Sequence, residues 1–137
     1  MWRCLLVVAV LFALPTLAWC ENAETADPDL IVVRRALVQI SKGAYNAETE
    51  KQVRRLGDAA SVAFTKVIGN REMTWIDIEN FLFLVHEAFA APYTIQNQRD
   101  HKPSTSLFVL RTLNRLPLSD ELKRSITDTR IFLEARQ

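Results

Sequence analysis

The sequence is poor in the residues that build common catalytic motifs. Its 137 residues include only three glycines and two histidines. Gly43, Gly57 and Gly69 stand far apart, so no glycine-rich loop for nucleotide phosphates is present. A Gly-x-Ser-x-Gly nucleophile motif is also absent. A Ser-His-Asp triad could still be assembled from residues far apart in the chain, because such triads are recognised by their geometry and not by a sequence motif. Because the sequence motifs are absent, we predict that the protein is not an enzyme.

The scarcity of histidine also argues against a metal centre. His86 and His101 are the only histidines, so carboxylates would have to supply the other ligands. Glu79 and His86 lie two turns apart on one predicted helix. The Glu-x-x-His spacing of di-iron bundles would need a glutamate at position 83, where the chain has Phe83. The sequence therefore predicts no metal and no other cofactor.

The first 20 residues have the pattern of a secretory signal peptide. One basic residue, Arg3, precedes an apolar run from Cys4 to Ala18, and the next charged residue is Glu21. This run falls short of the roughly 20 apolar residues that span a bilayer, and Pro15 interrupts it near its end. We predict a cleaved signal peptide over residues 1–20 and no stable membrane anchor. The mature protein would then be extracellular, or periplasmic in a bacterium.

Two cleavage sites fit the small residues that signal peptidase requires. Cleavage after Ala18 keeps Cys20, whereas cleavage after Cys20 removes both cysteines of the chain. Acylation of Cys20, as in a bacterial lipoprotein, would need a small residue where Trp19 stands. We favour cleavage after Cys20. The mature domain would then rely on its hydrophobic core alone, without disulfide bonds.

The charge balance does not indicate a nucleic-acid partner. Residues 21–137 contain all 16 acidic residues and 16 of the 17 basic ones. Four acids and no base fall within residues 21–29, which predicts an acidic, mobile N-terminal segment before a domain at 30–137. Residues 99–137 hold eight bases and five acids, far from the concentrated basic charge of nucleic-acid-binding domains.

Apolar residues recur every three or four positions along most of residues 27–137, which predicts helices. Asp27-Pro28 and Ser119 suit helix starts, and Thr74 with Asp77 resembles a capping box. We predict helices at 27–43, 46–69, 74–91, 104–116 and from 119 onward. No segment has the alternation of a strand. The sequence therefore predicts an all-α domain, a single bundle of about five short antiparallel helices.

Two features of these helices matter for the packing. Gly57 lies in the middle of the predicted helix 46–69, where it either allows close helix contact or is simply tolerated. The predicted helix 74–91 is apolar around much of its girth, which indicates a central position. Its apolar residues are Trp75, Ile78, Phe81, Leu82, Phe83, Leu84, Val85 and Phe89.

The connection at residues 92–103 is the longest predicted irregular segment, and such loops are often functional. We predict that the protein binds an unidentified protein partner through this loop and the basic residues that follow it, as a monomer or homodimer. Aromatic residues and arginines concentrate binding energy at interfaces. The predicted partner-binding residues are Tyr93, Ile95, Arg99, His101, Arg111 and Arg115.

An alternative hypothesis is a carrier that holds an apolar small molecule or lipid between its helices. Such a site would be lined by aromatic side chains from several helices. The candidates are Phe64, Trp75, Phe81, Phe83, Phe89 and Phe108. An enclosed apolar cavity would favour this carrier, whereas a filled core would favour the interaction module.

Overall fold

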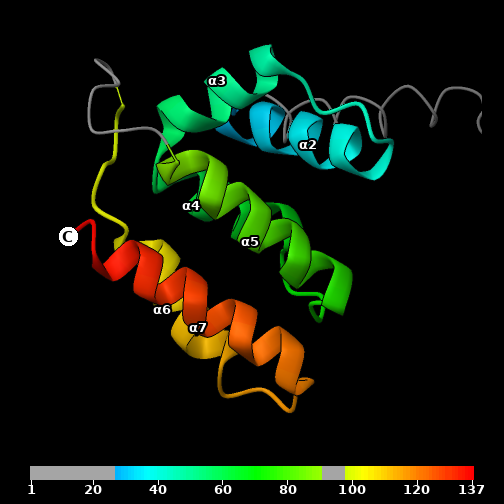
Figure 1. Cartoon of the computed structure of the whole chain (residues 1–137). Coiled ribbons are helices and arrows are strands. Elements are labelled where there is room, and N and C mark those ends of the chain that lie inside the picture. The colour runs from blue at the N-terminus through cyan, green and yellow to red at the C-terminus, as the bar shows by residue number, and fades with distance from the viewer. Residues whose placement is uncertain (1–26, 91–97) are drawn as a thin grey trace, which may run out of the picture.

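The structure is a computed structural model that describes residues 27–90 and 98–137 (Figure 1). The predicted signal peptide and most of the acidic segment lie outside these residues, as do Tyr93 and Ile95. No helix in the described part of the chain is both long and apolar enough to cross a membrane.

Every regular element of the described residues is a helix, which confirms the all-α prediction. The elements form three stacked pairs, with α4 and α5 between α2 and α3 on one side and α6 and α7 on the other (Figure 1). This middle position explains why α4 and α5 are so apolar. The helices are α2 (Pro28–Ser41), α3 (Ala47–Leu56), α4 (Ala59–Ile68), α5 (Trp75–Phe89), α6 (Ser104–Leu113) and α7 (Asp120–Glu134).

Helix α2 begins two residues before the predicted domain boundary at residue 30. The Asp27 carboxylate caps it by accepting a hydrogen bond from the Asp29 N–H at 3.0 Å, with Pro28 as the first helical residue. Asp27 also lies 3.7 Å from the Lys66 ammonium, and Asp29 forms an ion pair with Arg99. The last acids of the predicted mobile segment are therefore part of the folded domain.

The single helix predicted at 46–69 is wrong, because the chain breaks at Gly57 into α3 and α4. Gly57 has φ +55° and ψ −127°, a backbone conformation open to glycine but not to other residues without strain. The hydrophobic periodicity continues across the break, which is why the sequence pattern does not reveal it. A Cβ atom on Gly57 would lie only 2.0 Å from the carbonyl oxygen of Asp100.

The segment 98–100 is held at this break by hydrogen bonds to the backbone. The Asp58 N–H donates to the Asp100 carbonyl at 2.9 Å, and the Arg99 N–H donates to the Arg55 carbonyl at 3.1 Å. The side-chain amide of Gln98 donates to the carbonyl oxygens of Arg54 at 3.1 Å and Ala88 at 2.7 Å. The last part of the predicted loop 92–103 is therefore packed structure that joins α3, α4 and α5.

Asp58 caps the start of α6 although it lies far from that helix in the sequence. Its carboxylate accepts hydrogen bonds from the N–H groups of Thr105 at 2.7 Å and Ser106 at 2.9 Å. It also accepts one from the Ser106 hydroxyl at 2.6 Å, and Ser106 Oγ lies 2.6 Å from Ser61 Oγ. Asp58 is only 6% exposed. The buried carboxylate of the residue just before α4 thus satisfies N–H groups in the first turn of α6.

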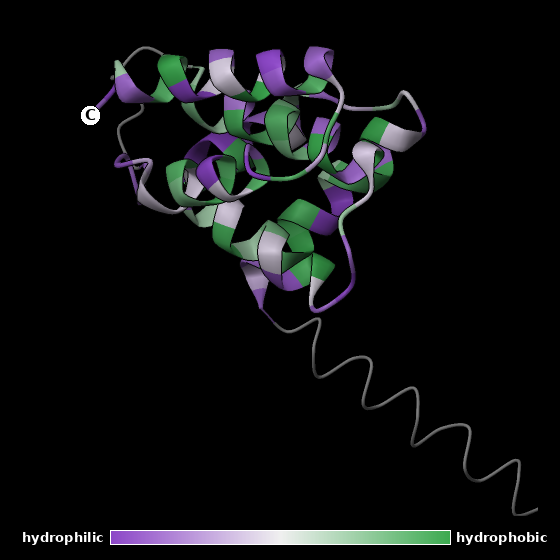
Figure 2. Cartoon of the chain, turned by 90° about the horizontal axis from the view of Figure 1, so that it is seen from below, coloured by the Kyte–Doolittle hydropathy of each residue, from purple (hydrophilic) through white to green (hydrophobic). Residues whose placement is uncertain are grey.

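The core is centred on α5, as its apolar composition predicts. Ile78, Phe81, Leu84 and Val85 are almost fully buried, and the Phe81 ring lies 5.1 Å from the Phe64 ring. Hydrophobic and hydrophilic residues alternate along the helices, as expected for amphipathic helices around a shared core (Figure 2). The predicted stripe is wrong at its first residue, Trp75, which is 62% exposed because the first turn of α5 extends beyond the core.

Candidate functional site

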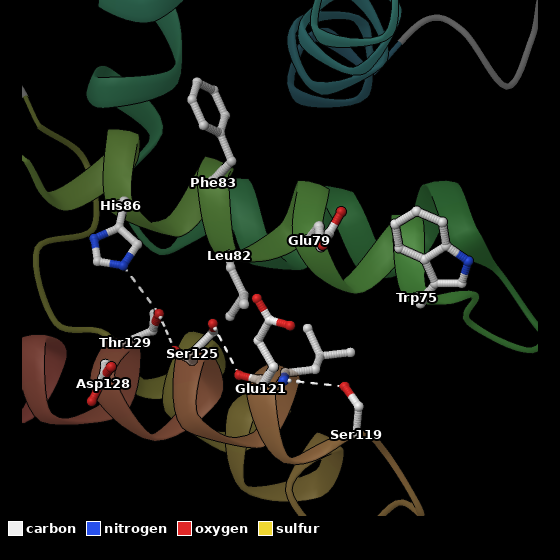
Figure 3. Close-up of a pocket in the computed structure, with 11 residues that line it drawn as sticks. Trp75, Glu79, Leu82, Phe83, His86, Ser119, Glu121, Ser125, Asp128 and Thr129 are labelled. Carbon is white, nitrogen blue, oxygen red and sulfur yellow. Dashed lines mark hydrogen bonds between the residues drawn. The ribbon is translucent and has the colours of Figure 1, made fainter.

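An open cleft of about 610 Å³ lies between α5 and α7 (Figure 3). Leu82 and Leu122 contribute apolar surface to it, and Trp75 lies at one end. Three of its lining residues are acidic and none is lysine or arginine. The acids are Glu79, Glu121 and Asp128, all of them exposed.

His86 is fixed at the side of this cleft by a hydrogen bond to α7. Its Nε2 atom lies 3.0 Å from Thr129 Oγ1 (Figure 3). The Thr129 hydroxyl donates its one hydrogen to the Ser125 carbonyl at 2.8 Å, so the bond to His86 requires Nε2 to be the donor. Burial and the nearby Arg136 guanidinium lower the pKa of His86 below 6.5. The structure therefore favours the neutral imidazole.

Because the folded state disfavours protonated His86, we expect the free energy of unfolding to fall as the pH is lowered. The unfolded chain gains this proton around pH 6.5, while the folded chain does so only at lower pH. Stability from this group is thus complete above pH 6.5 and is lost below it. Denaturant unfolding of the wild type and of His86→Gln at about pH 8 and about pH 5 measures the difference. An equal loss of stability in both proteins would contradict this role of His86.

The Ser125 hydroxyl, which lines the cleft, donates its hydrogen to the Glu121 carbonyl at 3.2 Å. Within residues 27–90 and 98–137, no three His, Cys, Asp or Glu side chains are grouped closely enough to hold a metal ion. Glu79 and His86, the pair considered from the sequence, both line the cleft without such a third ligand.

The described partner-binding residues of the prediction fall into two separate places. Arg99 and His101 are exposed and lie beside the α3–α4 break. Arg111 and Arg115 are exposed near the other end of α6, a helix about 15 Å long at 1.5 Å per residue. The structure therefore does not bring these four side chains into one cluster.

Arg99 has a structural role that the sequence does not reveal. Its guanidinium forms an ion pair with Asp29 of α2, and its backbone N–H donates a hydrogen bond to the Arg55 carbonyl. Arg99 and His101 border a depression of about 310 Å³, where the Asp58 carboxylate already accepts N–H groups of the first turn of α6. Because these donors are occupied, this helix start is a poor site for an external anion.

A second depression, which sequence reasoning missed, lies between α6 and the C-terminal part of α4. This groove of about 260 Å³ has an entirely apolar lining surface, and the Phe108 side chain in its lining is 70% exposed. The sequence pattern could have indicated an exposed Phe108, because this residue lies on the side of α6 opposite the buried face formed by Leu107, Leu110 and Leu113. The groove is lined by Thr65, Met73, Phe108, Val109, Thr112, Leu113 and Leu116.

The six aromatic residues of the carrier hypothesis are divided among three environments. Phe64, Phe81 and Phe89 are buried in the core. Trp75 and Phe83 border the α5–α7 cleft, where Phe83 packs edge-on against Tyr45 with ring centroids 5.1 Å apart. Phe108 borders the α4–α6 groove. These side chains therefore do not surround one shared space.

Comparison of the chain with protein-family models, with curated proteins and with solved structures finds no match.

Proposed function

We propose that this protein is an exported, non-enzymatic domain that binds another protein through the groove between α4 and α6. The observation that carries this proposal is the apolar groove with Phe108 at its edge. A phenylalanine that is 70% exposed gains substantially from burial, since full burial of such a side chain contributes about 1.5 to 3 kcal/mol. Export is inferred from the signal-peptide pattern of residues 1–20.

The size of the groove favours a side chain over a free small molecule. Pockets for small-molecule ligands usually measure roughly 300 to 1,000 Å³ and enclose most of the ligand. The groove is smaller, at about 260 Å³. A volume of this size suits one or two anchoring side chains of a partner, which is how interface hot spots are commonly built.

The proposal predicts that Phe108→Ser abolishes partner capture without unfolding the domain. The melting temperature should change little, because the substituted side chain is mostly exposed. Tagged wild-type and variant proteins, incubated with extracellular or periplasmic fluid of the producing organism, are compared by quantitative mass spectrometry. We expect at least one protein to lose about ten-fold or more in recovery with the variant.

Ile131→Ser on α7 is the matched control, because Ile131 is also an exposed apolar residue, at 57%. It should retain the captured proteins. Equal recovery with wild type, Phe108→Ser and Ile131→Ser would contradict the groove as the binding surface. Loss with Ile131→Ser alone would place the surface on α7.

A further inference from the structure

We infer that the groove between α4 and α6 takes an amphipathic helical segment of a partner protein, with acidic residues along the edge that faces α6. This inference rests on the proposed function and adds the chemistry of the partner. It depends on the charged residues near the groove and on the helical structure of the walls, whose backbone hydrogen bonds are made within the helices.

The α6 side of the groove is positively charged. Arg111 stands three residues after the groove-lining Phe108, and Arg115 stands three residues after the groove-lining Thr112, whose carbonyl accepts the Arg115 N–H at 3.2 Å. Both arginines are exposed. Arg111 lies 3.8 Å from the carboxylate of Glu134, which Arg130 also approaches at 3.5 Å, so two arginines share one acid. An acidic partner residue at this edge would therefore find uncompensated positive charge.

The opposite wall differs in charge, which gives the groove a direction. Thr65 and Met73 form this wall, and the residue before Met73 is the exposed acid Glu72. The bases near this wall are paired with acids, Lys66 with Asp27 at 3.7 Å and Arg71 with Asp77 at 2.7 Å. A partner with acids on both edges would thus meet repulsion on one side. We therefore place the acidic residues of the partner on the α6 edge alone.

The walls of the groove favour a helix as the bound element. Both are built from helices and a turn, and the described residues contain no strand whose edge could pair with an extended peptide. A helix laid along α6 can insert apolar side chains at positions i, i+4 and i+7 between two helical walls. Phe108 and Thr112, one turn apart on α6, and Leu116, just after its end, would form the facing row.

The test uses two fluorescent helical peptides of about 14 residues with the same apolar face of leucine and phenylalanine. One carries glutamates along one edge, and the other carries lysines at the same positions. Their affinities are measured by anisotropy, and their binding sites by amide shifts of the ¹⁵N-labelled protein. We expect shifts at residues 65 and 108–116 and about ten-fold tighter binding of the glutamate peptide.

The double variant Arg111→Glu/Arg115→Glu should reverse this preference. Lys123→Glu/Arg124→Glu on α7 changes the net charge equally and should leave the preference as in the wild type. Equal binding of both peptides in the groove would overturn the acidic-partner inference while leaving the proposed function intact. Binding of neither peptide there would overturn the helical-partner inference, and the capture experiment with Phe108→Ser would then decide the proposed function on its own.

The same side chains could also meet an anionic membrane, because exposed aromatic and basic residues suit that surface too. Vesicles of phosphatidylcholine with and without phosphatidylserine separate the two cases. We expect no vesicle binding that depends on Phe108. Phosphatidylserine-dependent binding that Phe108→Ser abolishes, with no peptide in the groove, would show that the partner is a membrane.

Discussion

Gly57→Ala is expected to be among the most destabilising single substitutions in this domain, with a loss of about 4 kcal/mol in the free energy of unfolding. Alanine at φ +55° is strained, and its Cβ would overlap the Asp100 carbonyl oxygen, 2.0 Å away. The segment 98–100 would have to move, and its hydrogen bonds to Arg55 and Asp58 would be lost. Urea denaturation of the wild type and the variant measures this loss.

Gly69→Ala separates the two contributions to this effect. Gly69 has nearly the same backbone conformation as Gly57, with φ +63° and ψ −137°. The nearest atom to its added Cβ is the Lys66 carbonyl oxygen at 3.9 Å, which is ordinary contact. Gly69→Ala should therefore cost only backbone strain, about 1 to 3 kcal/mol. Equal losses at the two glycines would show that the docking of segment 98–100 contributes nothing to stability.

Asp58→Ala is expected to lower the free energy of unfolding by about 3 kcal/mol. The substitution removes a buried carboxylate and leaves three donors of Thr105 and Ser106 without it. Removal of an exposed cap lowers the free energy of unfolding less, because the N–H groups that it leaves can form hydrogen bonds with water. Ser119→Ala is the control, because Ser119 caps α7 at an exposed position through one hydrogen bond of 3.3 Å, worth about 1 kcal/mol.

Thermal and urea unfolding of both variants test this difference. Hydrogen exchange at the amides of Thr105 and Ser106 should also accelerate in Asp58→Ala, because these N–H groups lose their acceptor. A loss no larger than that of Ser119→Ala would mean that the buried carboxylate does not stabilise α6 more than a surface cap does.

The local rules of helix formation were sufficient to predict most of the fold. Hydrophobic period and capping residues located α2, α5 and α7, since Asp27, Thr74 and Ser119 act as caps where the sequence places them. These features depend on neighbours within a few positions, so a sequence contains them. The central position of α5 likewise follows from its own composition.

The features that the sequence did not reveal depend on residues far apart in the chain. The break at Gly57 is stabilised by Asp100. The cap of α6 comes from Asp58, which precedes Thr105 and Ser106, its N–H donors, by 47 and 48 positions. Arg99 was predicted as a partner-binding residue, and its pairing with Asp29, 70 positions earlier, was not predicted. Such partners follow only from the tertiary arrangement.

The candidate groove was predictable in part. Arg111 and Arg115 were predicted as binding residues, and both are exposed, three residues after the groove-lining Phe108 and Thr112. Phe108 was assigned instead to an internal ligand site. Its position on the outward face of α6 indicates exposure, but the neighbouring wall from Thr65 and Met73 could be known only after the helices were packed.

The most direct test of the proposed interaction is photo-crosslinking in the producing organism. A photoreactive amino acid replaces Thr112 in the groove in one strain and Ser125 in the α5–α7 cleft in another. Both positions are exposed on helices, so neither replacement should disturb the core. We predict a covalent adduct with a partner protein from position 112 and none from position 125. An adduct from position 125 alone would contradict the proposal and move the binding site to the α5–α7 cleft.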